Sequence, residues 1–273
     1  MQLDTSRPIY ASFGGIIAIG NLKGGVGKST LAVGLAGAMA RTGKSVALVD
    51  GDPQATSRRW LVKSNLPIHV ETLDLDSLSS LESWLGRAER LVRAHGTVVV
   101  DLPATIGPAM ASAFLLARLI LVPVSLSAVD IDGTNRVLRY IRTARSERGS
   151  IGPEVMIVPN KLPRSVGIER PVLDVLHGFG EPVVGGLSLY PEHGRAFAAG
   201  CWIGDLVPGS RAHNEVMDLE AAVADAMRRT VQAPRIEAAK QERRDRERAA
   251  VVDAAKPPVR TPRLPWWQRI FAS

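Results

Sequence analysis

The chain has 273 residues, of which 45% are hydrophobic, so it is long enough to bury one sizeable core in a single large domain with an extension. Its net charge of +7 lies entirely in residues 228–273, which hold 12 Lys and Arg against 5 Asp and Glu. No run approaches the roughly 18 apolar residues of a membrane span, and the single cysteine, Cys201, excludes an internal disulfide framework and a multi-cysteine metal or iron–sulfur site within one chain.

Short β-rich runs alternate along the chain with longer helical patterns. Strands are expected at residues 16–20, 45–50, 68–73, 97–101, 119–124, 155–160 and 183–189, and helices at residues 29–41, 75–94, 130–148, 169–178 and 213–230. This alternation predicts an α/β fold with a mostly parallel sheet flanked by helices. We place the domain at residues 14–230, between an N-terminal extension of residues 1–13 and a charged, Pro-rich and partly disordered tail of residues 231–273.

A glycine-rich turn joins the first expected strand to the first expected helix. From Gly20 onward it reads Gly-Asn-Leu-Lys-Gly-Gly-Val-Gly-Lys-Ser-Thr. Successive N–H groups in such a turn converge on phosphate oxygens, and the helix N-terminus adds its positive dipole end. Lys28 supplies positive charge and the Ser29 hydroxyl supplies a ligand for Mg²⁺. The residues expected to bind the nucleotide phosphates are Gly24, Gly25, Val26, Gly27, Lys28, Ser29 and Thr30.

The turn departs from the common phosphate-loop pattern G-x-x-x-x-G-K-[ST]. Leu22 stands where that pattern has a glycine, and an additional lysine, Lys23, follows it. The stretch from Lys23 to Ser29 resembles the deviant Walker A motif K-G-G-x-G-K-[ST] of the ParA/MinD family of partition ATPases, in particular the small ParA type, and matches it at every position. The resemblance extends over residues 16–230. It implies a single P-loop domain in which Lys28 holds the β- and γ-phosphates of ATP, Ser29 ligates Mg²⁺, and Lys23 reaches across a dimer interface to the nucleotide of a second protomer.

Three carboxylates follow the ends of two expected strands. Asp50 and Asp101 end apolar runs that are typical of strands buried on both faces, and Asp52 follows two residues after Asp50. Ligands of open parallel sheets bind beyond the carboxyl ends of the strands, so we expect all three carboxylates near the glycine-rich turn. By resemblance to the family's D-x-D-P-Q and Walker B segments, Asp52 orients the attacking water, Asp101 binds Mg²⁺ through water, and Asp50 supports the Mg²⁺ water shell or the loop. The alternative is that Asp50 and Asp52 only cap the following helix.

Two later segments also resemble the family, with less specific chemistry. Residues 121–127 resemble the segment that carries its dimer and switch contacts. Val158-Pro-Asn-Lys161 resembles the segment whose asparagine faces the adenine edge. Asn160 is therefore expected to contact adenine, with an ordinary loop asparagine as the alternative.

The resemblance implies an ATP-dependent dimerising switch with ATP and Mg²⁺ as cofactors. A homodimer would form on ATP binding, and a ParB-like or adaptor protein would stimulate slow hydrolysis. ParA-like dimers bind nonspecific DNA, so we expect a cytoplasmic, nucleoid-associated ATPase for plasmid or chromosome partition. Such binding needs cations gathered on one face of the dimer. The candidates are Arg164, Arg170 and Arg195, followed by Arg139 and Arg142, and each also fits a solvated surface residue.

Two other functions stay open. MinD-like members bind anionic membrane, and the tail ends in aromatic and aliphatic residues at helical spacing beside arginines, namely Trp266, Trp267, Ile270 and Phe271. Peripheral membrane association, a docking peptide for a protein partner, and disorder without a role fit these residues equally well. A scaffold that uses ATP only to lock a dimer is the second alternative.

Overall fold

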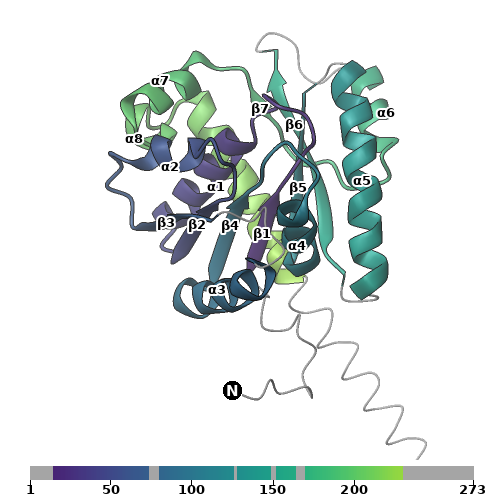
Figure 1. The fold of residues 1–273 in the computed structure, drawn as a ribbon. Coiled ribbons are helices and arrows are strands. Elements are labelled where there is room, and N and C mark those ends of the chain that lie inside the picture. Colours follow the sequence, from purple (N-terminus) through teal and green to yellow (C-terminus); the bar gives the residue numbers. More distant parts are fainter. Residues whose placement is uncertain (1–14, 74–79, 126–127, 149–151, 164–169, 230–273) are drawn as a thin grey trace, which may run out of the picture. The chain divides into compact units, whose positions relative to one another are not determined.

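The computed structural model describes residues 15–73, 80–125, 128–148, 152–163 and 170–229 (Figure 1). The chain divides into a unit of residues 1–231 and a unit of residues 232–273. The second unit and the N-terminal extension lie outside the described residues, so the expectations for these two segments stay predictions. The domain boundaries stay a prediction.

A seven-stranded sheet forms the centre of the first unit. Its order is β3-β2-β4-β1-β5-β6-β7, and every described strand pairing is parallel. The strands are β1 (Ile16–Ile19), β2 (Val46–Asp50), β3 (Ile68–Thr72), β4 (Thr97–Asp101), β5 (Leu119–Ser125), β6 (Glu154–Leu162) and β7 (Leu187–Ser188). The predicted α/β fold with a parallel sheet is confirmed.

Helices cover both faces of the sheet (Figure 1). One face packs against α3 (Ser80–His95), α4 (Pro108–Leu116), α5 (Ala128–Arg148) and α6 (Arg170–His177). The other packs against α1 (Lys28–Arg41), α2 (Thr56–Leu61), α7 (Pro191–Ala199), α8 (Ile203–Leu206) and the helical residues 211–229. Because side chains alternate along a strand, β1 sends Ile16 and Ala18 into the first core and Ile17 and Ile19 into the second.

The structure differs from the sequence prediction mainly in short elements. The strand expected at residues 183–189 is reduced to β7, and Val183 forms only an isolated bridge with Ile157. Four helices were not predicted: α2, α4, α7 and α8. Eight of the nine residues of α4, PAMASAFLL, are apolar, with Ser112 as the exception, so the helix carries no helical period, and α8 has only four residues. Among the described residues, no helix is both long and apolar enough to cross a membrane.

Helix α1 packs against one large side chain that comes from much later in the sequence. Trp202 is buried, and its Nε1 donates a hydrogen bond of 3.1 Å to the carbonyl oxygen of Gly34. A Cβ placed on Gly37 would lie 2.2 Å from Cδ1 of Trp202. By contrast, a Cβ on Gly194 in α7 would meet no described atom within 4 Å. The glycine at position 37 is therefore a packing requirement.

We expect Gly37→Ala to lower the free energy of unfolding by about 1–3 kcal/mol, because the added methyl overpacks the contact with the indole. Gly194→Ala is the matched control, since it makes the same change inside a helix where space is free. It should raise the free energy of unfolding by about 0.5–1 kcal/mol through helix propensity. Urea denaturation of both variants measures the two effects. A Gly37→Ala variant as stable as Gly194→Ala would contradict the packing described.

Candidate nucleotide-binding site

The glycine-rich turn lies between β1 and α1, where the sequence placed it. Gly25 and Gly27 have positive φ angles of 76° and 92°, and α1 begins directly after Gly27. A Cβ on Gly27 would lie 2.1 Å from Nδ2 of Asn160. Position 27 therefore requires glycine both for its left-handed backbone and for the close approach of Asn160.

The amine of Lys28 is buried inside this turn. Its Nζ donates a hydrogen bond of 3.2 Å to the carbonyl oxygen of Lys23, and 7% of the residue is exposed. Burial lowers the pKa of Lys28, while the negative charges of Asp101 and Asp52 act in the opposite direction. The structure thus brings together Lys28, Asp52 and Asp101, as the sequence predicted.

Lys23 combines a fixed backbone with an exposed side chain. Its N–H donates to Oδ1 of Asn21 over 3.2 Å, and its carbonyl oxygen accepts the bond from Lys28. The residue itself is exposed. A second molecule could therefore reach the Lys23 amine without any rearrangement of the turn.

Asn21 was not singled out by the sequence analysis, although it holds the turn in place. Its side chain is buried, and its Nδ2 donates to the carbonyl oxygen of Pro123 (2.8 Å) and to Oγ1 of Thr134 (3.2 Å). Together with the bond from Lys23, these contacts fasten the turn to the end of β5 and to α5. The only signal in the sequence is a polar residue directly after an apolar strand.

Asn160 is buried against the same turn. Its Nδ2 donates to the carbonyl oxygen of Val26 over 2.7 Å, and its Oδ1 accepts the N–H of Lys161 over 2.8 Å. Asn160 therefore holds the glycine-rich turn in place through the carbonyl oxygen of Val26. Its contact with adenine stays a prediction.

Asp50 and Asp101 are direct neighbours on adjacent parallel strands. Both are buried. Asp50 accepts hydrogen bonds from the N–H of Asp52 (3.2 Å) and of Arg58 (2.9 Å), whereas Asp101 accepts one from the hydroxyl of Ser57 (2.6 Å). Of the two roles expected for Asp50, support of the loop is the one for which the structure provides contacts.

Burial raises the pKa of both carboxyl groups. The pKa of Asp101 reaches about 7, although the nearby hydroxyls of Ser57 and Ser29 lower it. Its Oδ1 is buried and has no hydrogen-bond partner among the described residues. An unpaired buried carboxylate oxygen beside a serine at a helix start is a donor set that suits Mg²⁺ and its bound water.

Asp52 lies in the loop between β2 and α2. It is half-buried, and its Oδ1 accepts the N–H of Gln54 over 2.9 Å. Ala55, the residue before α2, has a positive φ of 49°. The loop therefore turns sharply between the Asp52 carboxylate and the helix.

Three of the five arginines proposed for DNA binding have described side chains, and these lie on helices that cover different faces of the sheet. Arg195 is exposed on α7, while Arg139 and Arg142 are exposed on α5, which covers the opposite face of the sheet. Arg164 lies outside the described residues, as does the side chain of Arg170, which begins α6. DNA binding by these arginines stays a prediction.

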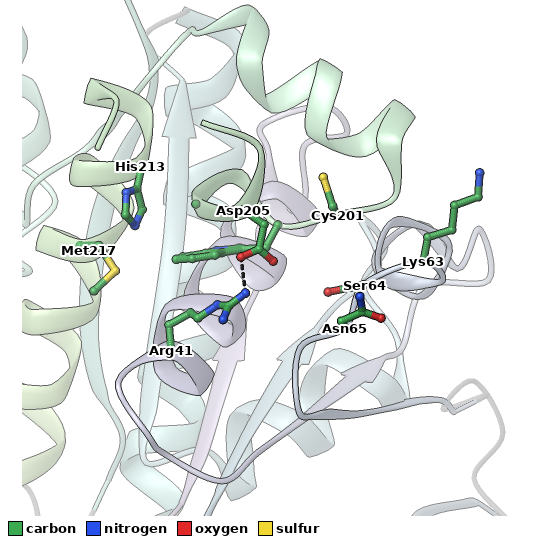
Figure 2. A pocket seen from close by; sticks show the side chains of 10 residues that line it. Arg41, Lys63, Ser64, Asn65, Cys201, Asp205, His213 and Met217 are labelled. Carbon is green, nitrogen blue, oxygen red and sulfur yellow. Dashed lines mark hydrogen bonds and ion pairs between the residues drawn. The ribbon is translucent and has the colours of Figure 1, made fainter. Parts of the chain in front are cut away.

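A separate hollow of about 710 Å³ lies at the other end of α1 (Figure 2). It contains none of the residues predicted to bind nucleotide. Arg41, the last residue of α1, forms an ion pair there with Asp205. A helix rises about 1.5 Å per residue, so the hollow is about 20 Å from the start of α1.

Comparison with known proteins shows the family of the chain. The family model for the CobQ/CobB/MinD/ParA nucleotide binding domain matches residues 17–200. The chain is 30% identical over 181 residues to the chromosome partitioning protein ParA of Caulobacter vibrioides, covering 52% of this chain and 66%, just under two thirds, of that protein. It is 26% identical over 172 residues to the maintenance of carboxysome distribution protein A of Halothiobacillus neapolitanus, covering 62% of this chain and 76% of that protein. The fold is similar to that of the septum site-determining protein MinD with Mg-ADP from Pyrococcus horikoshii, with a TM-score of 0.61, 18% identity, and coverage of 77% and 95%.

Proposed function

Because the chain belongs to the CobQ/CobB/MinD/ParA nucleotide-binding family, we propose that it is a Mg²⁺-dependent ATPase whose ATP-bound dimer partitions plasmid or chromosomal DNA. The observation that carries the proposal is the buried Lys28 amine, which lies in a glycine-rich turn under the influence of Asp101 and Asp52. Phosphoryl transfer is catalysed mainly by positioning and charge, and this arrangement supplies both.

The side chains of the site have divided roles in this proposal. The backbone N–H groups of residues 24–30 and the Lys28 amine bind the phosphates, while the Asp52 carboxylate orients the attacking water. The Ser29 hydroxyl and the free Asp101 Oδ1 hold Mg²⁺ and its water, with Asp50 shaping the loop beside them. Bound Mg²⁺ neutralises charge on the phosphate oxygens. Asn160 Oδ1 has a second lone pair, which would accept the adenine amino group.

We propose that ATP joins two copies of the chain. The support is the exposure of Lys23 beside a turn whose backbone is held by hydrogen bonds within the chain. In this dimer the Lys23 amine contacts the nucleotide of the second protomer. A partner protein of the ParB or adaptor type then stimulates hydrolysis and so releases the dimer from its surface.

The surface we propose is nonspecific DNA, at the nucleoid of the cytoplasm. It is supported by the likeness to the Caulobacter partitioning protein and by the excess of Lys and Arg in residues 228–273. Movement of another cargo, or a membrane role through the tail, is the second candidate. It is supported by the likeness to the carboxysome distribution protein and by the aromatic end of the tail.

We expect the ATP-loaded full chain to sediment with nonspecific duplex DNA, and Lys23→Ala to lose this binding because it cannot dimerise. The assay compares ATP with ADP, DNA with anionic liposomes, and the full chain with residues 1–230. DNA binding that survives removal of the tail supports partition by the domain itself. Liposome binding that is lost with the tail favours the membrane alternative, and dimers that never hydrolyse ATP favour a scaffold.

A further inference from the structure

A serine that the family motifs do not explain is hydrogen-bonded to the carboxylate of Asp101. Ser57 lies in the first turn of α2 and has 0% exposure. Its Oγ donates to Oδ2 of Asp101 over 2.6 Å, and the two residues are 44 positions apart in the chain. The distance is typical of a strong bond from a hydroxyl to a carboxylate.

We propose that Ser57 is a positioning residue for Mg²⁺: its hydroxyl fixes the Asp101 carboxylate through Oδ2, so that Oδ1 is presented to the water shell of the metal. The inference rests on the function proposed above, because it requires a Mg²⁺-nucleotide in this site. The terminal torsion of an aspartate is broad, so a carboxylate without such a contact can rotate. With Oδ2 held by the Ser57 hydroxyl, Oδ1, which has no hydrogen-bond partner among the described residues, is left as a directed acceptor.

The first turn of α2 is hydrogen-bonded to the carboxylates of both Asp50 and Asp101. The N–H of Arg58 donates to Oδ2 of Asp50 over 2.9 Å, beside the bond from Ser57 to Asp101. The backbone also links the two strands here, because the N–H of Gly51 donates to the carbonyl oxygen of Asp101 over 2.9 Å. Ser57 therefore joins the end of β4 to the helix that follows the Asp52 loop, and so couples the metal ligand to that loop.

A bond of this kind has a measurable effect when its donor is removed. Groups that orient metal ligands typically change metal affinity by about 10–100-fold when they are lost. Phosphate binding by the glycine-rich turn does not pass through Ser57, since none of the described contacts of the turn involves it. The metal dependence should therefore change while metal-free nucleotide binding does not.

The test is a Mg²⁺ titration of the full chain with a fluorescent N-methylanthraniloyl ADP. Ser57→Ala and Ser57→Cys should each raise the half-saturating Mg²⁺ concentration by about 10–100-fold. The cysteine fills the space with a weak donor, and it serves if the alanine variant fails to fold. Ser57→Thr should have a half-saturating Mg²⁺ concentration close to that of the parent, because threonine retains the hydroxyl. Ser64→Ala is the matched control, since the Ser64 hydroxyl accepts a hydrogen bond from the nearby N–H of Leu66 and lies in none of the described contacts of the nucleotide site.

The outcomes separate this inference from the proposed function. In EDTA, all variants should bind the nucleotide as the parent does. A parental Mg²⁺ dependence in Ser57→Ala or Ser57→Cys overturns the inference, as does an equal loss of binding with and without Mg²⁺. If the parent itself binds no nucleotide, or binds it without regard to Mg²⁺, the proposed function fails and the inference falls with it.

Discussion

Asp52→Ala is expected to slow ATP hydrolysis by about a hundredfold or more, while ATP-dependent dimers persist. Asp52 is the half-buried carboxylate in the loop after β2. Its negative charge acts to raise the pKa of the buried Lys28 amine. Loss of a group that orients or deprotonates the attacking nucleophile typically costs about 10²–10⁴-fold in rate. Phosphate release measures the rate, and light scattering after gel filtration with ATP measures the dimer.

The matched control for this variant is Asp218→Ala, which removes an exposed carboxylate from the helical residues 211–229. Its hydrolysis rate should equal that of the parent. Normal hydrolysis by Asp52→Ala would remove Asp52 from the proposed mechanism. Loss of dimers together with hydrolysis would show that the residue acts in binding.

Lys28→Ala is expected to weaken ATP binding by about a hundredfold to a few thousandfold. Among the buried residues of the described chain Lys28 is the only lysine or arginine, and its amine lies in the glycine-rich turn. Removing one partner of a buried charge pair costs about 3–5 kcal/mol, and 1.4 kcal/mol corresponds to a factor of ten. Isothermal titration calorimetry with ATP and Mg²⁺ measures the affinity.

Lys63→Ala is the control for this second variant, because Lys63 is an exposed lysine close to the end of α2. It should bind ATP as the parent does. Circular dichroism of Lys28→Ala verifies that the fold is retained despite the lost bond to the Lys23 carbonyl. ATP affinity equal to that of the parent would contradict the proposed phosphate contact.

The long apolar strands could be predicted from the sequence because their environment is encoded locally. The expected strand at 97–101 coincides with β4, and the strand expected at 45–50 differs from β2 by one residue. Both are continuous apolar runs closed by an aspartate. In contrast, α4 is apolar except for Ser112 and β7 has only two residues, so neither shows a hydrophobic period in the sequence.

The same distinction applies to the candidate site. Lys28 and Ser29 follow from the spacing of one short motif. The supporting contacts of Asn21, Ser57 and Asn160 depend on partners that lie 113, 44 and 134 positions away in the chain. No pattern in a single sequence pairs such positions, because folding alone brings them together.

The two buried asparagines also have a thermodynamic consequence. Asn21 hydrogen-bonds to the N–H of Lys23 and Asn160 to the carbonyl oxygen of Val26, so groups of the protein itself hold the glycine-rich turn. The conformational entropy of this segment is therefore lost during folding, and a phosphate group meets donors that are already oriented. In the proposed switch, movement between nucleotide states must therefore come from segments outside this turn.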